Sequence, residues 1–144
     1  MKTLLVVHFA ATWYMVGLIW LVQVVHYPLF AAVSREGFVA YEQAHTRLIS
    51  FVVIPPMLIE LGLAILFVMK RPEQLPLWAA VTGAFLVVVI WLSTFLLQVP
   101  QHTTLGSGFD ARAHAVLVAT NWIRTLAWTA RGVIAAVPFL LSKT

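Results

Sequence analysis

The sequence predicts an all-α integral membrane protein, a four-helix bundle with a short interfacial helix between helices 1 and 2. The first observation is composition. Of the 144 residues, 62% are hydrophobic and 10% are charged, and the mean hydropathy is +0.95; a soluble domain is about 45–50% apolar and about 25% charged. The second is that four mostly apolar segments reach the ~20 residues needed to cross a bilayer. A chain of this length is expected to form one domain, residues 1–144.

The four apolar segments are expected to form helices at residues 3–25, 48–69, 77–99 and 113–141. The first resembles the apolar part of a secretory signal peptide. It is longer than such a part and is interrupted by Trp13, Tyr14 and Trp20, so we expect it to be retained as a helix. The second contains Pro55 and Pro56, whose rings remove two amide hydrogens, and a kink is expected there.

Three connections of different character join these segments. Residues 70–76 form a tight polar turn with prolines near both ends. Residues 100–112 are expected to be a loop, because they begin with proline and contain two glycines. The first connection, 27–47, is longer. Its aromatic and histidine residues recur at helical spacing from Phe38 to His45, and this predicts the interfacial helix.

Lysine and arginine residues beside the segments indicate an orientation, since they favour the cytoplasmic side. The end of the bundle with both termini carries all three lysines, Lys2, Lys70 and Lys143, together with Arg71. The opposite end carries Arg35, Arg47 and Arg112. We therefore expect a multi-pass protein of a bacterial inner membrane with both termini in the cytoplasm.

Composition also limits the partners. The net charge is +4 without a basic run, so no nucleic-acid partner is expected. The chain has no cysteine, which excludes disulfides and thiolate metal sites. The expected partners are membrane lipids and a hydrophobic small molecule, with a homo-oligomer or a larger membrane complex as further alternatives.

Polar residues in the first segment share one helix face. His8 and His26 are separated by eighteen residues, which make five turns of an α-helix. Thr12 and Gln23 lie on the same face. Polar groups that face lipid are costly, so this face is expected to point into the bundle.

The second and fourth segments carry charges at similar depth. At 1.5 Å per residue, Glu60 lies about 18 Å beyond the start of its segment and Arg124 about 16 Å beyond the start of the fourth. We therefore predict an ion pair between them. Arg131 either extends toward the helix end or faces an anionic group. Five residues form one polar seam of the fourth segment: His114, Asn121, Arg124, Trp128 and Arg131.

Histidines gather at the end opposite the termini. His26, His45 and His102 are predicted metal ligands, because converging imidazoles suit zinc, copper or iron. Glu42 and His45 form a Glu-x-x-His motif, half of a di-iron signature. A di-iron centre is not expected, because the chain has too few acidic residues for the full ligand set.

Two short patterns resemble known families. The opening His8, Trp13 and Gly17 resembles small four-helix membrane proteins such as the haem-binding bacterial protoporphyrinogen oxidase and copper-resistance membrane proteins. This resemblance implies haem b as a cofactor, with His8 as its ligand. The pattern from Asn121 to Arg131 is similar to anthrone-oxygenase-like four-helix proteins.

Two classes of function remain open. The first is a metal- or haem-dependent redox or oxygenase-like protein that acts on a hydrophobic anionic or quinone-like molecule. Glu60 and Arg124 would be its catalytic residues. Its substrate would contact Gln23, Asn121, Arg124, Trp128 and Arg131, in a cavity between helices 1, 2 and 4 with helix 3 as a wall. The second class is a non-catalytic accessory subunit or lipid-binding protein whose polar seam only locks the helices.

Overall fold

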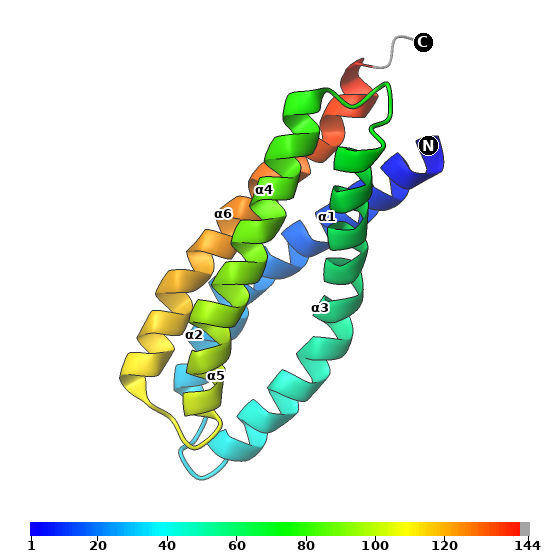
Figure 1. The fold of residues 1–144 in the computed structure, drawn as a ribbon. Coiled ribbons are helices and arrows are strands. Elements are labelled where there is room, and N and C mark those ends of the chain that lie inside the picture. Colours follow the sequence, from blue (N-terminus) through cyan, green and yellow to red (C-terminus); the bar gives the residue numbers. More distant parts are fainter. Residues whose placement is uncertain (142–144) are drawn as a thin grey trace.

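Four long helical rods make up the computed structural model, which describes residues 1–141 (Figure 1). The first rod joins α1 (Lys2–Leu21), a π-helical turn (Val22–His26), α2 (Tyr27–Leu29) and a 3₁₀ turn (Phe30–Ala32). The second is α3 (Phe38–Met69). The third joins α4 (Leu77–Ser93), a second π-helical turn (Thr94–Gln98) and α5 (Val99–Leu105), and the fourth is α6 (Ala111–Leu141). Each rod is long and apolar enough to cross a membrane, by length and composition.

The predicted interfacial helix does not exist as a separate element. The residues assigned to it are the first turns of α3, which runs for 32 residues without a break. Extending a helix orders one residue per added hydrogen bond, whereas starting a new helix orders several, so continuation is favoured. The predicted loop at 100–112 is also too long. It shrinks to 106–110, because the third rod continues past Pro100, whose missing amide hydrogen falls where the π-helical turn Thr94–Gln98 already interrupts the regular α-helical hydrogen bonds.

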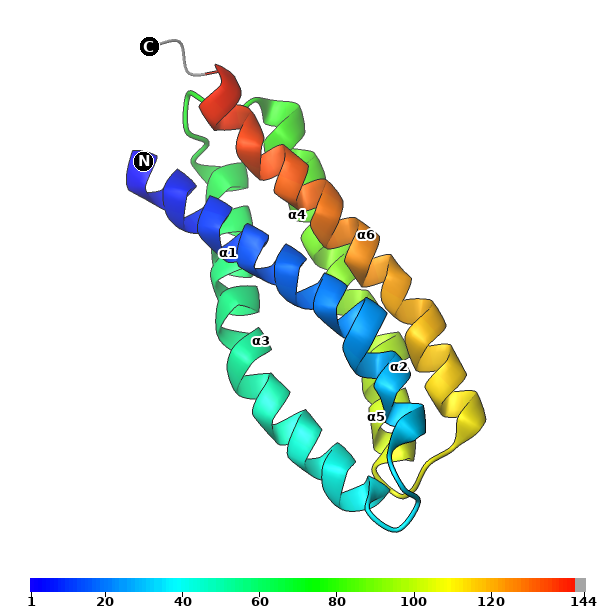
Figure 2. The same ribbon diagram turned by 180° about the vertical axis from the view of Figure 1, so that it is seen from behind.

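Pro55 and Pro56 lie inside α3 and do not end it. They leave the carbonyls of Phe51 and Val52 without their usual amide donors. The Tyr14 hydroxyl donates to the Val52 carbonyl at 3.5 Å. Figures 1 and 2 show α3 bowing away from α4 and α5 and returning to them near its start.

The rods pack with α6 against both α1 and α4, and with α3 closing the other side of the bundle (Figure 2). Residues of the larger apolar core include Met15, Phe30, Leu117 and Trp128. A second cluster near the chain ends contains Leu5, Leu63, Phe67 and Leu75. Large apolar side chains are exposed along all four rods, and Trp20, Trp78 and Trp122 are among them.

Candidate functional site

A cluster of buried polar side chains gathers around Glu60 and joins all four rods. Its Oε1 accepts hydrogen bonds from the Thr12 hydroxyl at 2.8 Å and from Nε and Nη2 of Arg131 at 3.2 and 3.1 Å. Its Oε2 accepts the indole N–H of Trp128 at 2.8 Å. Arg131 also donates to the Gly83 carbonyl. We call these five residues the Glu60 clamp.

The predicted ion pair between Glu60 and Arg124 is wrong, because Glu60 pairs with Arg131. Arg131 is 1% exposed, so it does not extend toward the helix end. The depth of Glu60 was estimated from a predicted helix start at residue 48, whereas α3 begins at Phe38. Counted from the helix starts that the structure shows, Glu60 lies 22 residues after Phe38 and Arg131 lies 20 residues after Ala111, which places them at similar depth.

His8, the predicted haem ligand, lies beside this clamp. Its Nε2 is 3.2 Å from Nη2 of Arg131. Since a guanidinium only donates hydrogen bonds, this nitrogen accepts one. The ring also meets Phe67 edge-on, with 5.5 Å between the ring centroids. The lone pair on Nε2 is thus engaged within the protein, and a haem role for His8 stays a prediction.

A second polar group is built around Arg124 of α6. Its Nε and Nη2 donate to the amide oxygen of Asn121 at 2.9 and 2.6 Å. Nη2 also donates to the Tyr27 hydroxyl at 3.2 Å, and Nη1 donates to the Thr94 hydroxyl at 3.4 Å. Asn121 in turn donates to Oε1 of Gln23 at 2.8 Å. The structure therefore brings Gln23, Asn121 and Arg124 together, whereas the other predicted binding residues, Trp128 and Arg131, belong to the Glu60 clamp.

Arg124 differs from Arg131 in having no carboxylate partner. Within residues 1–141, the arginine–carboxylate ion pair is that of Arg131 with Glu60, and the other close carboxylate contact joins Glu42 to the His102 ring, which is charged only when it is protonated. Arg124 is 7% exposed. A guanidinium has five N–H donors, and the bonds just described use four of them. One N–H of Nη1 has no partner within that part of the chain.

From Arg124, hydrogen bonds continue to the start of α3. The Tyr27 hydroxyl is 3.0 Å from Nε2 of His102. Nδ1 of His102 is 2.5 Å from Oε1 of Glu42, a buried carboxylate. The Tyr27 carbonyl accepts a hydrogen bond from Nε2 of His114 at 2.8 Å. Helix α2, the start of α3 and helix α5 thus supply one connected chain of polar groups.

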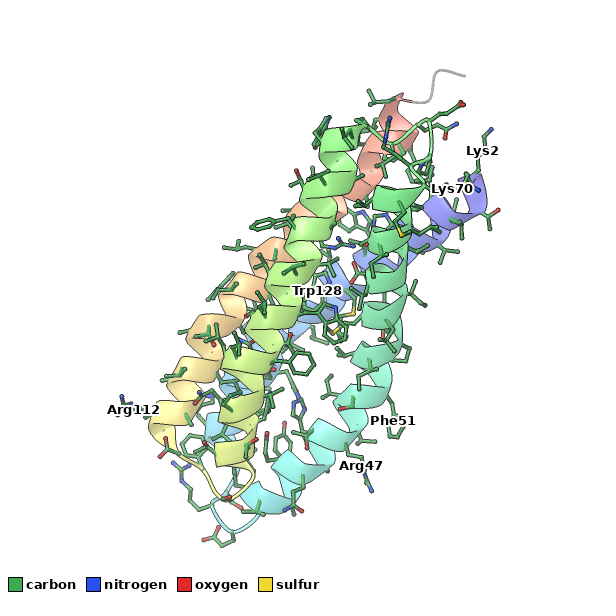
Figure 3. All side chains as sticks on the ribbon, viewed as in Figure 1. Lys2, Arg47, Phe51, Lys70, Arg112 and Trp128 are labelled. Atoms are coloured by element: carbon green, nitrogen blue, oxygen red, sulfur yellow. The ribbon has the colours of Figure 1, made fainter. Side chains whose placement is uncertain are left out.

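A cavity of about 610 Å³ lies beside this chain. Tyr27, His102 and Arg124 are among its polar lining residues. Most of its wall is apolar, with aromatic rings and methionines that include Met15, Met57, Trp91, Phe95 and Trp128. Figure 3 shows Trp128 between α4 and α3. Phe95 and Ile54 also line the cavity and are 57% and 49% exposed. The cavity therefore reaches the outer surface between α3 and the third rod, where α3 bows outward (Figure 1).

The predicted cavity is present with a different lining. Of the predicted substrate contacts, Arg124 and Trp128 line it, whereas Gln23, Asn121 and Arg131 do not. His102 lines it as well, but the other predicted metal ligands, His26 and His45, and the predicted catalytic residue Glu60 do not. The third rod is more than a wall, because its π-helical turn supplies Gln98 to the lining. All four rods therefore surround the cavity, because the third rod extends past the helix boundary that the sequence indicated.

The predicted metal ligands come close together but are bonded differently. Nε2 of His26 and Nδ1 of His45 are 2.8 Å apart, so one donates to the other. The rings of His45 and His102 have centroids 5.4 Å apart. No group of three or more histidine or acidic side chains among residues 1–141 is placed to hold a metal ion. Nε2 of His45 and Oε2 of Glu42 are buried in the same range without a hydrogen-bond partner. Metal binding stays a prediction.

Sequence reasoning did not assign three residues to this site: Tyr27, Glu42 and Gln98. Tyr27 and Gln98 lie near predicted helix boundaries, whereas Glu42 lies within the predicted interfacial helix, where it was considered only as part of the Glu-x-x-His motif. For Gln98 a signal was available, because Thr94, Gln98 and His102 follow one another at intervals of four, the spacing of one helix face. That spacing could have extended the third helix past Pro100. No comparable pattern marks Tyr27.

Comparisons with protein-family models, with curated proteins and with solved structures found no match to this chain. Fold and site define an all-helical chain of four long rods, with a buried polar chain beside a largely apolar cavity. The function is therefore argued from this geometry.

Proposed function

We propose that the chain crosses a membrane four times and binds, inside it, a hydrophobic small molecule with an anionic or quinone-like oxygen group. Four rods of sufficient length and hydropathy support the membrane setting. The exposed apolar side chains along them fit a lipid environment. One observation supports this choice of ligand: Arg124 is a buried cation at the cavity wall, without a carboxylate partner within residues 1–141.

The energetics favour an oxygen-bearing ligand. A charged side chain deep in a membrane costs several kcal/mol unless it is paired or hydrated. An anionic or strongly polarised carbonyl oxygen beside Arg124 would take the unused N–H and offset part of this cost. The cavity volume of about 610 Å³ falls within the roughly 300–1,000 Å³ of small-molecule sites.

The side chains then have distinct roles. Arg124 binds the oxygen group, while Asn121 and Gln23 hold its guanidinium in place. Trp128 forms part of the wall and is itself fixed by its bond to Glu60. We therefore assign the Glu60 clamp to structure. A metal- or haem-dependent redox reaction on the same ligand stays a prediction of the sequence; the visible spectrum and metal content of the purified protein test it.

Ligand titration of the purified protein in lipid nanodiscs tests the proposal. Trp91 and Trp128 line the cavity, so tryptophan fluorescence reports on it. A decyl-substituted quinone and a twelve-carbon fatty acid are the probes. We expect at least one of them to bind saturably. Arg124→Gln should weaken that binding by about tenfold, because one charge-assisted hydrogen bond is worth about 1.5–3 kcal/mol.

Arg112→Gln is the matched control, since it removes an arginine from the same helix at an exposed position. Its affinity should equal that of the wild type. Circular dichroism of both variants separates loss of binding from loss of fold. The proposal is contradicted if neither probe binds saturably. It is also contradicted if the folded Arg124→Gln variant binds the probe as tightly as the wild type does.

The alternative function is a non-catalytic accessory subunit or lipid-binding protein. One observation favours it: within residues 1–141, only two buried side-chain polar atoms lack a hydrogen-bond partner. Such a satisfied network can serve as a lock between helices. Under this alternative, the wild type binds neither probe, and Arg124→Gln lowers only the stability of the protein.

A further inference from the structure

The Tyr27 hydroxyl lies at the centre of a hydrogen-bonded chain whose direction can be worked out. It is 3.2 Å from Nη2 of Arg124 and 3.0 Å from Nε2 of His102. The other ring nitrogen of His102 is 2.5 Å from a carboxylate oxygen of Glu42. Tyr27 is buried, and Tyr27, His102 and Arg124 all line the cavity.

For the neutral ring of His102, counting hydrogens sets the direction of each bond. The guanidinium of Arg124 has no acceptor, so the Tyr27 oxygen accepts in that bond. Tyr27 has one hydroxyl hydrogen, and Nε2 of a neutral His102 accepts it. Nδ1 of the same ring then carries its hydrogen and donates it to the carboxylate of Glu42. Glu42 therefore fixes the tautomer of His102, and His102 fixes the hydroxyl of Tyr27.

This arrangement leaves one hydrogen-bond acceptor, on Tyr27, and one hydrogen-bond donor, on Arg124, for a ligand in the cavity. The hydrogen of Tyr27 is already donated to His102, so its oxygen offers the ligand only an acceptor lone pair. Arg124 offers the ligand a donor through its unused N–H. A ligand group that satisfies both residues must donate a hydrogen bond to Tyr27 and accept one from Arg124.

We infer that Tyr27 selects ligands that carry a phenolic hydroxyl, as in the reduced hydroquinone form of a quinone-like molecule, over ligands that lack this hydrogen. The inference rests on the proposed function and names its ligand class. One phenolic oxygen meets both demands, because its hydrogen reaches Tyr27 and its lone pair accepts from Arg124. A quinone or an aryl ether accepts from Arg124 and leaves the Tyr27 lone pair unpaired. The ring lies against Trp91, Phe95 and Trp128 of the cavity wall.

The test compares three ligands that share one ring and one decyl chain: the hydroquinone, its dimethyl ether and the quinone. Binding to the full-length protein in nanodiscs is measured without oxygen by competition with a fluorescent probe. The wild type should bind the hydroquinone about tenfold more tightly than the ether or the quinone, as expected for one additional hydrogen bond in a buried site.

Two variants connect this preference to the chain of hydrogen bonds. Tyr27→Phe should bring the ratio of hydroquinone to ether affinity close to one and leave the ether affinity within about twofold of wild type. His102→Leu keeps Tyr27 but removes its acceptor, so the hydroxyl hydrogen turns toward the ligand and donates to the oxygens of all three compounds. The ratio should fall there as well, which a purely structural role of Tyr27 does not explain.

The outcomes separate the two claims. If none of the three ligands binds, the selection by Tyr27 is wrong, and if the twelve-carbon fatty acid does not bind either, the proposed function fails. If the hydroquinone and the ether bind the wild type equally, the site exists and the selection by Tyr27 is wrong. A ratio that stays near ten in Tyr27→Phe would also overturn the inference. Should a variant not fold, the wild-type ratio alone decides.

Discussion

Buried polar side chains link the helices of this bundle, and Glu60 accepts four of these hydrogen bonds. Its two oxygens receive donors from α1 and α6. Arg131 extends these contacts to Gly83 of α4. A buried ion pair of this kind stabilises little relative to an apolar pair of similar volume, yet removing one partner alone is strongly destabilising.

Glu60→Gln should therefore lower the free energy of unfolding by about 3–5 kcal/mol, because it leaves the Arg131 guanidinium buried without a counter-charge. Changing Glu60 to Leu and Arg131 to Met together should cost less than the two single changes added. Equilibrium unfolding in detergent measures this double-mutant cycle.

The same cycle with Arg124 in place of Arg131 is the control, and it should show the smaller coupling energy. A larger coupling for Glu60 with Arg124 than with Arg131 would contradict the pairing that the structure shows.

For single residues, the sequence predicted which polar side chains are buried better than it predicted which of them pair with one another. The inward face with Thr12 and Gln23, and the seam with Asn121 and Trp128, are confirmed, because those side chains are buried. Polar groups in an apolar helix have one favourable direction, and spacing alone reveals it. Which arginine meets Glu60 depends on where each helix starts. An error of about ten residues in that start moves the estimate by about 15 Å.

Helical elements show irregularities where the cavity lies. Both π-helical turns, Val22–His26 and Thr94–Gln98, contribute residues to its lining. The proline pair of α3 directly follows Ile54, another residue of the lining. A π turn inserts one residue into a helix and recurs at functional sites. It leaves no signature in composition, so the sequence predicted the helices and the proline kink but not these turns.

Close packing between α1 and α6 depends on Gly132. A side chain begun there would place its Cβ 3.1 Å from Cγ2 of Val16 and 3.4 Å from Cε2 of Trp13. Gly132→Leu should therefore force the two helices apart and lower the free energy of unfolding by about 1–3 kcal/mol. Thermal or denaturant unfolding in detergent measures the change.

Gly62→Leu is the matched control, since Gly62 is also inside a helix and a Cβ added there would meet nothing within 4 Å. It should be neutral or slightly stabilising, because leucine favours a helix more than glycine does. Equal destabilisation by the two variants would show that helix contact at Gly132 is not limiting.

Over the whole molecule, positive residues lie at the two ends of the bundle. Figure 3 shows Lys2 and Lys70 at one end, and Arg47 and Arg112 toward the other. Lys143, which the sequence places with the first group, lies outside the described residues. Figure 1 places the N-terminus and the end of α6 at the same end. The alternation of four rods follows from the apolar segments themselves, whereas their orientation in a membrane rests on the charge distribution alone.

That orientation gives the last prediction, that both termini face the cytoplasm. The chain has no cysteine, so single cysteines introduced at exposed positions of opposite turns report their side directly. Ser107→Cys lies in the turn before α6, and Glu73→Cys lies in the turn before α4. In intact bacterial cells, a membrane-impermeant maleimide should label Ser107→Cys and should reach Glu73→Cys only after the membrane is opened, because the lysine-rich end favours the cytoplasm. The reverse labelling pattern would invert the topology, and it would place the His102 end of the cavity nearer the cytoplasm.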